Sequence, residues 1–484
     1  MKRFLPAALI AALALATARV PAATAAAPSS LNQQQSEELV VTYAHLVDDF
    51  YQKVDRQTVL NGARDSLVAY LKAVHIANPT LPAIRATEDD ASNVRALERE
   101  VNLALEQYGP NIKTEDAMTA STQLTYAAIA GTLASVKDKY TTFLTPKQYA
   151  ELNDNLDGTS FGGVGISYSP DEKHGVLRIE NVILGGPSDK AGLQPEDEIT
   201  AIDGKSVSDM FAPTMSEKDD QKRLAAQQKL VTQALRGNPG TQVRLAVQRA
   251  GKPVNPVLIT RAEIHQPSVL SKMLPGDIGY VDLAVFGQTT GQELDAALKR
   301  LDSEGAKAYI LDLRSNGGGY LNAAVDVSSK FISSGPIVSV KSRAGTDTEY
   351  DAENTAIPPR PLAVLVNQYT ASASEITAGA IQDSGVGTII GVKTYGKGVV
   401  QSIWQLPDKS AIKITTARYF TPKGRDINTV GIEPEIRADI PTDPAACKTL
   451  RFGDPSHDPQ LVSAVNFVTG RIAQQAPPSN APGR

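Results

Sequence analysis

A serine and a lysine lie on two neighbouring segments whose residue types would suit nucleophilic catalysis. Ser372 stands in YTASASEITAGAIQD, and Lys397 follows in TYGKGVVQ. No histidine lies near the serine in the sequence, so a nucleophilic serine here needs another general base, and a buried lysine is the main alternative. The lysine would have to lose about three pKa units from its ordinary ~10.4, which burial in an apolar site can supply. The pair predicts acyl transfer by a serine that a neutral lysine activates.

Both residues also have purely structural interpretations. Ser372 and Glu375 form the S-x-x-E pattern of a helix capping box, and a capping serine needs no chemistry. Lys397, between two glycines, also fits an exposed strand residue. Gln401, four positions on, is predicted to orient the lysine amine through its side-chain oxygen, because residues at an even offset on a strand point to one face.

A glycine-rich loop supplies the third chemical element. LDLRSNGGGYL (311–321) places three consecutive glycines after a buried strand, and exposed N–H groups in such a loop form an anion nest. We expect the N–H groups of Gly318 and Ala373 to form a two-donor oxyanion hole. The alternative is a tight turn without a ligand. Asp312 and Arg314, in the same strand, are predicted to fix the loop structurally.

The elements that must position these residues alternate between strand and helix. Short apolar runs bounded by turn residues read as strands, and the amphipathic stretches between them read as helices, which together predict a layered α/β core. The predicted strands are 279–286, 308–315, 362–367 and 388–392, and the predicted helices are 290–305, 322–333 and 372–385.

The rest of the chain divides into regions that differ in residue composition and hydrophobic pattern. A helix-rich stretch is followed by β-branched runs around a helix at 221–235, and then by the α/β segment. The predicted divisions are a signal peptide (1–25), an N-terminal helical domain (31–119), the first part of the core (120–157), a β-barrel-like module (158–264), the core (265–440), a C-terminal helical extension (441–475) and a disordered tail (476–484).

The N-terminal sequence and the composition indicate the cellular location and the classes of ligand to expect. Lys2 and Arg3 precede an apolar run that ends before an Ala-Thr-Ala pattern, which predicts a cleaved secretory signal peptide and a periplasmic or extracellular location. The alternative is an N-terminal membrane anchor. The net charge of −5 gives no indication of the basic surface that nucleic-acid binding requires. The five histidines form no metal-spaced pair, so we expect no metal.

Taken together and in this order, the motifs resemble the C-terminal processing peptidases, also called tail-specific proteases, which use a Ser-Lys dyad. The resemblance covers roughly residues 128–435 and includes KDKYTTFLTPKQYAELN, DLRSNGGG, ASASEITAGAIQD and YGKGVVQ. It implies a crotonase-like layered α/β core. It also implies that Ser372 is the nucleophile, Lys397 the general base and Gln401 its partner, with Gly318 and Ala373 as the oxyanion hole. The chain departs from the family pattern at Gly317, Asp426 and Asn428.

The module at 158–264 resembles a PDZ domain. Its GGVGI segment is similar to a carboxylate-binding loop, which implies that Gly163, Val164, Gly165 and Ile166 bind the substrate. In such a domain, backbone N–H groups hold a terminal carboxylate while the peptide adds as a strand to the sheet edge. The alternative is a structural glycine turn. Glu196 stands where a glycine is common.

The predicted function is therefore that of a secreted serine endopeptidase whose PDZ module captures free C-terminal tails of protein substrates. The expected architecture is multidomain α/β, and no metal or organic cofactor is expected. An adaptor protein and homo-oligomerisation are left open. Two alternatives remain: a catalytically silent peptide-binding scaffold, and acyl-CoA chemistry on a related core. The predicted signal peptide disfavours the acyl-CoA alternative.

Overall fold

The computed structural model describes residues 30–113, 118–157, 160–183, 186–194, 196–217, 220–265, 267–343, 345, 347–439 and 453–475. The predicted signal peptide and C-terminal tail lie outside the described residues, as does the beginning of the predicted C-terminal extension. The described residues divide into two units. Unit 1 runs up to Ala44 and from Val54 to Lys137, and unit 2 holds His45–Lys53 and the described residues from Asp138 onward.

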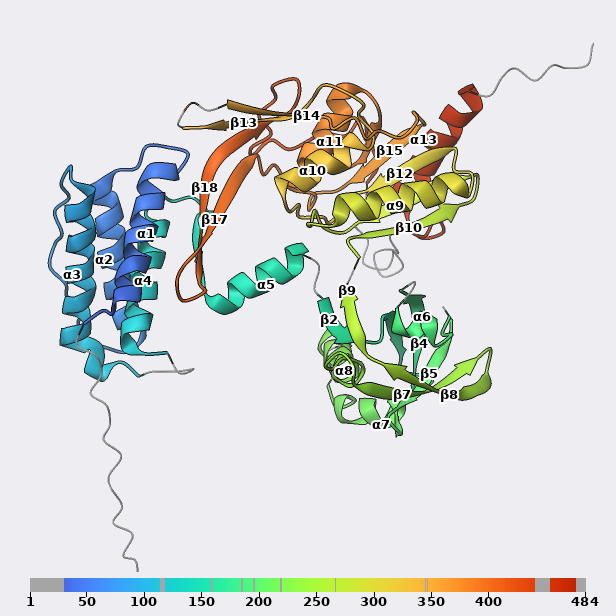
Figure 1. The fold of residues 1–484 in the computed structure, drawn as a ribbon, viewed down its shortest axis with the longest axis horizontal. Helices are drawn as coiled ribbons and strands as arrows, with labels where there is room; N and C mark the ends of the chain where they lie inside the picture. Colours follow the sequence, from blue (N-terminus) through green and yellow to red (C-terminus); the bar gives the residue numbers. More distant parts are fainter. Residues whose placement is uncertain are drawn as a thin grey trace, which may run out of the picture. The chain divides into compact units, whose positions relative to one another are not determined.

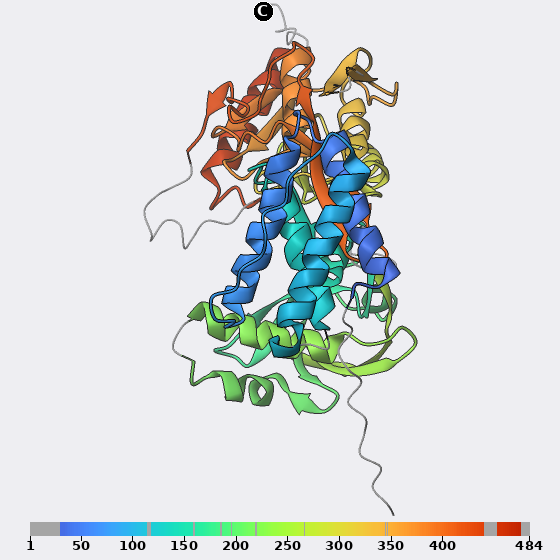
Figure 2. The ribbon, with the colours of Figure 1, turned by 90° about the vertical axis from the view of Figure 1, so that its left-hand side faces the viewer.

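Unit 1 is helical. Its helices α2, α3 and α4 lie side by side (Figures 1 and 2). Gly62 of α2 and Gly131 of α4 allow these helices to approach closely, because a Cβ on either glycine would lie 2.6 Å or less from the other's carbonyl oxygen. The unit therefore includes α4, which the sequence analysis placed with the core. The helices are α1 (Gln33–Asp49), whose residues from His45 onward belong to unit 2, α2 (Arg56–Ala73), α3 (Asp90–Tyr108), the 3-10 turn η1 (Gly109–Asn111) and α4 (Ala120–Ala134).

Within unit 2, the predicted β module is a small sheet with short helices. The strand order is β3-β4-β5-β7-β8, with β6 on β5, while β2 pairs with β9. Glu196 has φ +69, a conformation that favours glycine, which explains why a glycine is expected there. The elements are β2 (Ser160–Gly163), β3 (Ile166–Asp171), β4 (Val176–Val182), α6 (Pro187–Lys190), β5 (Glu198–Ile202), β6 (Lys205–Ser206), α7 (Val207–Phe211), η2 (Ala212–Thr214), α8 (Asp220–Leu235), β7 (Gln242–Arg249), β8 (Lys252–Thr260) and β9 (Ala262–His265).

The α/β core is a six-stranded sheet in the order β10-β11-β12-β15-β16-β19, parallel except for the β10–β11 pair. Alternate strand residues face opposite layers: Leu311 and Val364 pack with α9, α10 and α11, whereas Ile310 and Ala363 pack with α13. The predicted layered core is confirmed. Its elements are β10 (Val269–Leu274), β11 (Ile278–Leu283), α9 (Thr290–Ser303), β12 (Ala308–Asp312), α10 (Leu321–Ser329), β15 (Leu362–Val366), α11 (Ala373–Ser384), β16 (Thr388–Gly391), β19 (Ile436–Arg437) and α13 (Pro459–Gln475).

A second sheet flanks this core, with β18 at its centre. It has the order β1-β18-β13-β14, and β17 pairs with β18 as a long hairpin that is plain in Figure 1. The elements are β1 (Thr142–Leu144), α5 (Pro146–Asp157), β13 (Pro336–Ser342), β14 (Asp347–Asp351), β17 (Val399–Gln405) and β18 (Ala411–Phe420). None of the helices described is both long enough and apolar enough to span a bilayer.

A buried charge cluster joins the core sheet to α13. The Arg314 guanidinium donates to Asp312 at 2.9 Å and to Asp458 at 2.8 Å, and all three side chains are almost fully buried. Asp458 also accepts the Leu461 N–H at 3.1 Å in the first turn of α13. This geometry is consistent with the structural role that the sequence analysis predicted for Asp312 and Arg314.

Candidate active site

Ser372 lies at the turn between β15 and α11, directly before the first helical residue. Its backbone has φ 59 and ψ −120, a conformation that non-glycine residues rarely adopt. The Glu375 carboxylate accepts the Ser372 N–H at 2.9 Å, and the Glu375 N–H donates to the Ser372 carbonyl at 2.8 Å. The predicted capping box is present, so the serine ends a strained turn as well as starting a helix.

Glu375 does more than cap the helix. It is fully buried, and its carboxylate also accepts the N–H groups of Lys397 at 2.8 Å and Gly396 at 2.7 Å. Charge-assisted hydrogen bonds of this kind are roughly twice as strong as neutral ones. One carboxylate therefore ties the serine turn to the lysine loop, a role that the sequence analysis did not predict.

Tyr419 of β18 joins the same two segments from the other side. Its hydroxyl is within hydrogen-bonding distance of the Ser372 carbonyl, at 3.0 Å, and of the Lys397 carbonyl. The side chain is 2% exposed, and burial raises the pKa of the phenol well above its ordinary value. It therefore remains a neutral donor.

Lys397 lies in the loop between β16 and β17 and lines the same cavity as Ser372. Its amine is 5.1 Å from the centre of the Tyr140 ring. Burial, and then the nearby Lys413 cation, lower the pKa of Lys397 to about 8, against an opposing effect of Glu375 and Asp138. The environment thus favours the neutral amine. Among the described residues, no hydrogen bond joins the Ser372 hydroxyl to this amine in the present conformation.

The cavity that holds both side chains has a volume of about 620 Å³. Part of its lining is apolar, since α5 contributes Leu152 and Leu156 and the turn after β11 contributes Val285. Lys413, which lines the cavity from β18, is a second, half-buried amine that the sequence analysis did not identify, and its pKa is also lowered by partial burial. The space suits an extended peptide segment with an apolar side chain.

The glycine loop approaches the serine turn as expected. Gly318 has φ +99, and a Cβ there would lie 2.8 Å from the Ala373 nitrogen and from the Ser372 Cβ. The Ala373 N–H, in the first turn of α11, has no acceptor among the described residues. The Gly318 N–H, in contrast, donates to Asn316 Oδ1 at 2.8 Å. One of the two predicted oxyanion donors is therefore engaged internally.

Asn316 is a further residue that the sequence analysis missed. It is 1% exposed, and its side-chain amide donates to the Leu283 carbonyl at 2.6 Å. Its own carbonyl accepts the Ala371 N–H and the Ser374 hydroxyl, each at 3.0 Å. Asn316 thereby connects β11, the glycine loop and the serine turn.

Gln401 lines the cavity, but its predicted partnership with Lys397 is not formed here. Its amide nitrogen donates to the Val399 carbonyl at 3.2 Å, and no hydrogen bond to Lys397 occurs among the described residues. Lys397 and Gln401 do not share one regular strand face, because β17 begins after Lys397 and a bulge separates Val400 from Gln401. The role of Gln401 stays a prediction.

The predicted carboxylate-binding loop lies at the start of β3. The N–H groups of Val164 and Gly165 have no acceptor among the described residues, and Gly165 has φ +77. β3 is the end strand of its sheet, so its outer edge is open, and α8 lies beside it through Tyr168, whose hydroxyl is 3.2 Å from Thr232 Oγ1. This geometry suits strand addition.

Elsewhere in the described part of the chain, no group of three or more His, Cys, Asp or Glu side chains is placed to hold a metal ion.

Comparisons with known proteins identify the family and one of its domains. The family model "Peptidase family S41" matches residues 277–438, and the PDZ domain model matches residues 178–232. A carboxyl-terminal-processing protease from Synechocystis sp. is 36% identical over 354 residues, which cover 72% of this chain and 78% of that protein. The carboxy-terminal processing protease CtpA of Bacillus subtilis is 35% identical over 324 residues, which cover 67% and 66%.

Among solved structures, the photosystem II D1 C-terminal processing protease aligns with 89% of this chain and 100% of that protein, with 26% identity and a TM-score of 0.44. The identity to the curated relatives extends over about two thirds or more of this chain and of those proteins. The chain therefore belongs to peptidase family S41 and to its C-terminal-processing proteases, which are serine peptidases, and it carries a PDZ domain.

Proposed function

We propose that this chain is a serine endopeptidase in which Ser372 is the nucleophile and Lys397 the general base. The observation that carries the proposal is the lysine amine in the same cavity as the serine, with its pKa lowered to about 8 by burial. A base works best when its pKa lies near the working pH, because it is then often neutral and still accepts a proton readily. Glu375 and Tyr419 support the pair by holding the two backbone segments together.

The proposed reaction follows from these positions. Substrate binding brings the Ser372 hydroxyl and the neutral Lys397 amine into contact, and the amine takes the serine proton as the oxygen attacks a peptide carbonyl. The resulting oxyanion accepts the Ala373 N–H and the Gly318 N–H, which exchanges its bond to Asn316 for the new acceptor. The protonated lysine then gives its proton to the leaving amine, and water hydrolyses the acyl-enzyme by the reverse route.

We further propose that the PDZ domain selects protein substrates by their free C-terminal tails. A terminal carboxylate would accept the N–H groups of Val164 and Gly165, and the preceding residues would pair with the open edge of β3. The signal-peptide pattern at the N-terminus supports export, and hence a periplasmic or extracellular site of action.

The test is proteolysis of a protein substrate with an apolar free C-terminus. Ser372→Ala and Lys397→Ala should each lower kcat/KM by ~10³-fold or more. Ser384→Ala on the same helix and Lys393→Ala in the same loop are matched controls that should retain activity. Undiminished cleavage by either dyad variant would refute the assignment. Amidating the substrate tail should slow cleavage, whereas binding without any cleavage by the wild type would favour a silent scaffold.

A further inference from the structure

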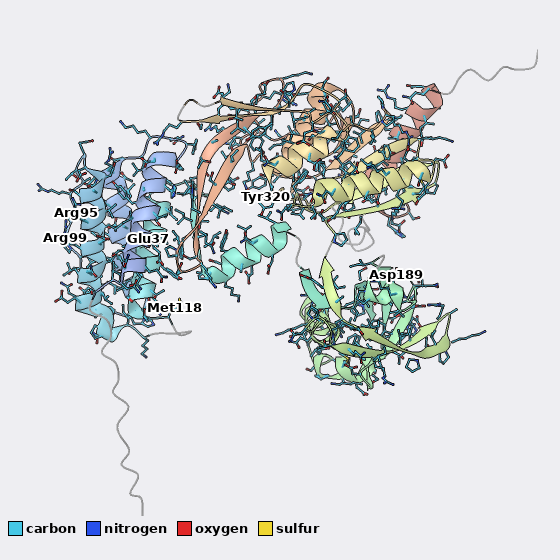
Figure 3. All side chains as sticks on the ribbon, in the orientation of Figure 1. Glu37, Arg95, Arg99, Met118, Asp189 and Tyr320 are labelled. Carbon is cyan, nitrogen blue, oxygen red and sulfur yellow. The ribbon has the colours of Figure 1, made fainter. Side chains whose placement is uncertain are left out.

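A second cavity, with a volume of about 720 Å³, adjoins the one that holds Ser372 and Lys397. The two cavities share three lining residues: Tyr320 and Leu321 at the start of α10, and Val400 of β17. Figure 3 labels Tyr320, whose side chain borders both. A peptide held at the serine can therefore continue into the second cavity without leaving a common wall.

The walls of the second cavity combine apolar surface with acidic groups. Tyr350 and Val340 belong to the second sheet, and Asp326 and Glu353 provide carboxylates, while no Lys, Arg or His is among its described lining residues. Lys330, outside the lining, pairs with Asp326 at 3.0 Å and offsets that charge. Glu353 is exposed, and no cationic nitrogen of the described residues lies within 4.0 Å of its carboxylate. One negative charge is thus left uncompensated.

These walls are fixed by regular elements and their hydrogen bonds. The Glu353 N–H donates to Ser329 Oγ at 3.0 Å, which ties the residue to the end of α10. Gly291, in the first turn of α9, lets this helix lie directly against the Asp326 side chain, because a Cβ at this position would lie 1.6 Å from Asp326 Oδ2. The cavity is therefore a formed feature of the fold.

We propose that this second cavity is a substrate subsite that takes a lysine or arginine side chain close to the scissile bond. Such side chains bury an aliphatic stem against apolar surface and keep the charged group at the rim. Tyr320, Tyr350 and Val340 would contact the stem, and Glu353 would pair with the charged group. This inference rests on the proposed function, because it assigns the recognition of a side chain to the same catalytic site.

The test uses peptides with one apolar free C-terminal tail and one varied residue. Lys, Arg, Gln or Glu is placed in turn at each of the three positions on either side of the bond that the wild type cleaves. At one position, the Lys and Arg peptides should be cleaved with a kcat/KM about two- to fivefold above the Gln peptide, and the Glu peptide should be poorest.

Two substitutions at one residue make the assignment specific. Glu353→Gln should remove the preference at that position, and Glu353→Arg should reverse it in favour of the Glu peptide, a gain that misfolding cannot produce. Glu349→Gln, which changes an exposed carboxylate on β14, is the matched control and should leave the preference unchanged.

The outcomes separate this inference from the proposed function. Ser372-dependent cleavage without a charge preference at any position, or with a preference that both Glu353 variants retain, would overturn the subsite and leave the peptidase assignment standing. Failure of the wild type to cleave any peptide would instead overturn the proposed function, and the subsite with it.

Discussion

The lowered pKa of Lys397 leads to a prediction about the pH dependence of the activity. With a pKa of about 8, about a tenth of the lysine is neutral at pH 7, whereas an ordinary lysine near 10.5 would be neutral in only about 0.03% of molecules. The environment therefore raises the population of the active base at pH 7 by about 300-fold, equivalent to roughly 3 kcal/mol. Since the proposed mechanism needs the neutral amine, kcat/KM should rise with pH with a midpoint near pH 8 and level off above about pH 9.

Lys413→Met tests the cause of this shift. Lys413 is the second contributor to the lowered pKa, after burial, because two neighbouring cations destabilise each other. Removing it should raise the pKa of Lys397, so the midpoint of the pH profile moves upward and the rate at pH 7 falls, while the plateau at high pH is retained. The loss at pH 7 should stay well below about 300-fold, because burial remains.

The assay is kcat/KM from pH 6 to pH 10 for the wild type, Lys413→Met and the control Lys409→Met, which changes an exposed lysine between β17 and β18. Circular dichroism at each pH shows whether the fold is retained. A midpoint that is unchanged or lower in Lys413→Met would refute the electrostatic coupling. A profile that is flat or falling between pH 6 and pH 9 in the wild type would refute Lys397 as the base.

Three further predictions follow from contacts described above. Gly318→Ala should lower kcat by ~10²–10³-fold with a similar KM. The new Cβ would crowd the Ala373 nitrogen, and alanine disfavours the φ of this position. A normal kcat in steady-state kinetics would contradict this prediction. Tyr419→Phe should cost about 1–3 kcal/mol in urea unfolding, since two carbonyls lose a buried donor, and unchanged stability would argue against the bridge. Burial raises the pKa of Glu100 from 4.5 to about 7, so unit 1 should lose stability as the pH rises through that range, by up to roughly 3 kcal/mol. Glu100→Gln should abolish that loss between pH 5 and pH 8 in urea unfolding, and an equal slope in the variant would exclude Glu100 as its source.

Local patterns were enough to predict the central sheet and the strand and helix that flank Ser372. β12 and β15 read as continuous apolar runs because both of their faces are covered by helices, and the helix after Ser372 carries its own capping signal. The lowered pKa of Lys397 was also predictable in direction, because a lysine base requires burial.

The supporting residues were not predictable, because their roles depend on which distant segments meet. Tyr419 reaches Ser372 only through the pairing of β18 with β17 and β13, and local patterns do not show which distant strands pair in that second sheet. The sequence indicates only that Asn316 lies in a turn, because its hydrogen bond to the Leu283 carbonyl is visible only in the folded structure. The reasoning for Gln401 relied on regular alternation of side chains along a strand, and the bulge between Val400 and Gln401 removes that reasoning without testing the role itself.

The ion pair between Arg314 and Asp458 bears on when the protein becomes able to act. The two partners are separated by 144 positions, and the candidate oxyanion loop begins just after Arg314. Because chains fold by domains as they are synthesised, the buried guanidinium lacks one of its two carboxylates until the last described helix has been made. Removing one partner of such a pair costs about 3–5 kcal/mol. Formation of the buried pair, and with it the support of the candidate oxyanion loop, therefore depends on a segment 144 positions further along the chain, so a chain that stops before Asp458 would be a poor protease.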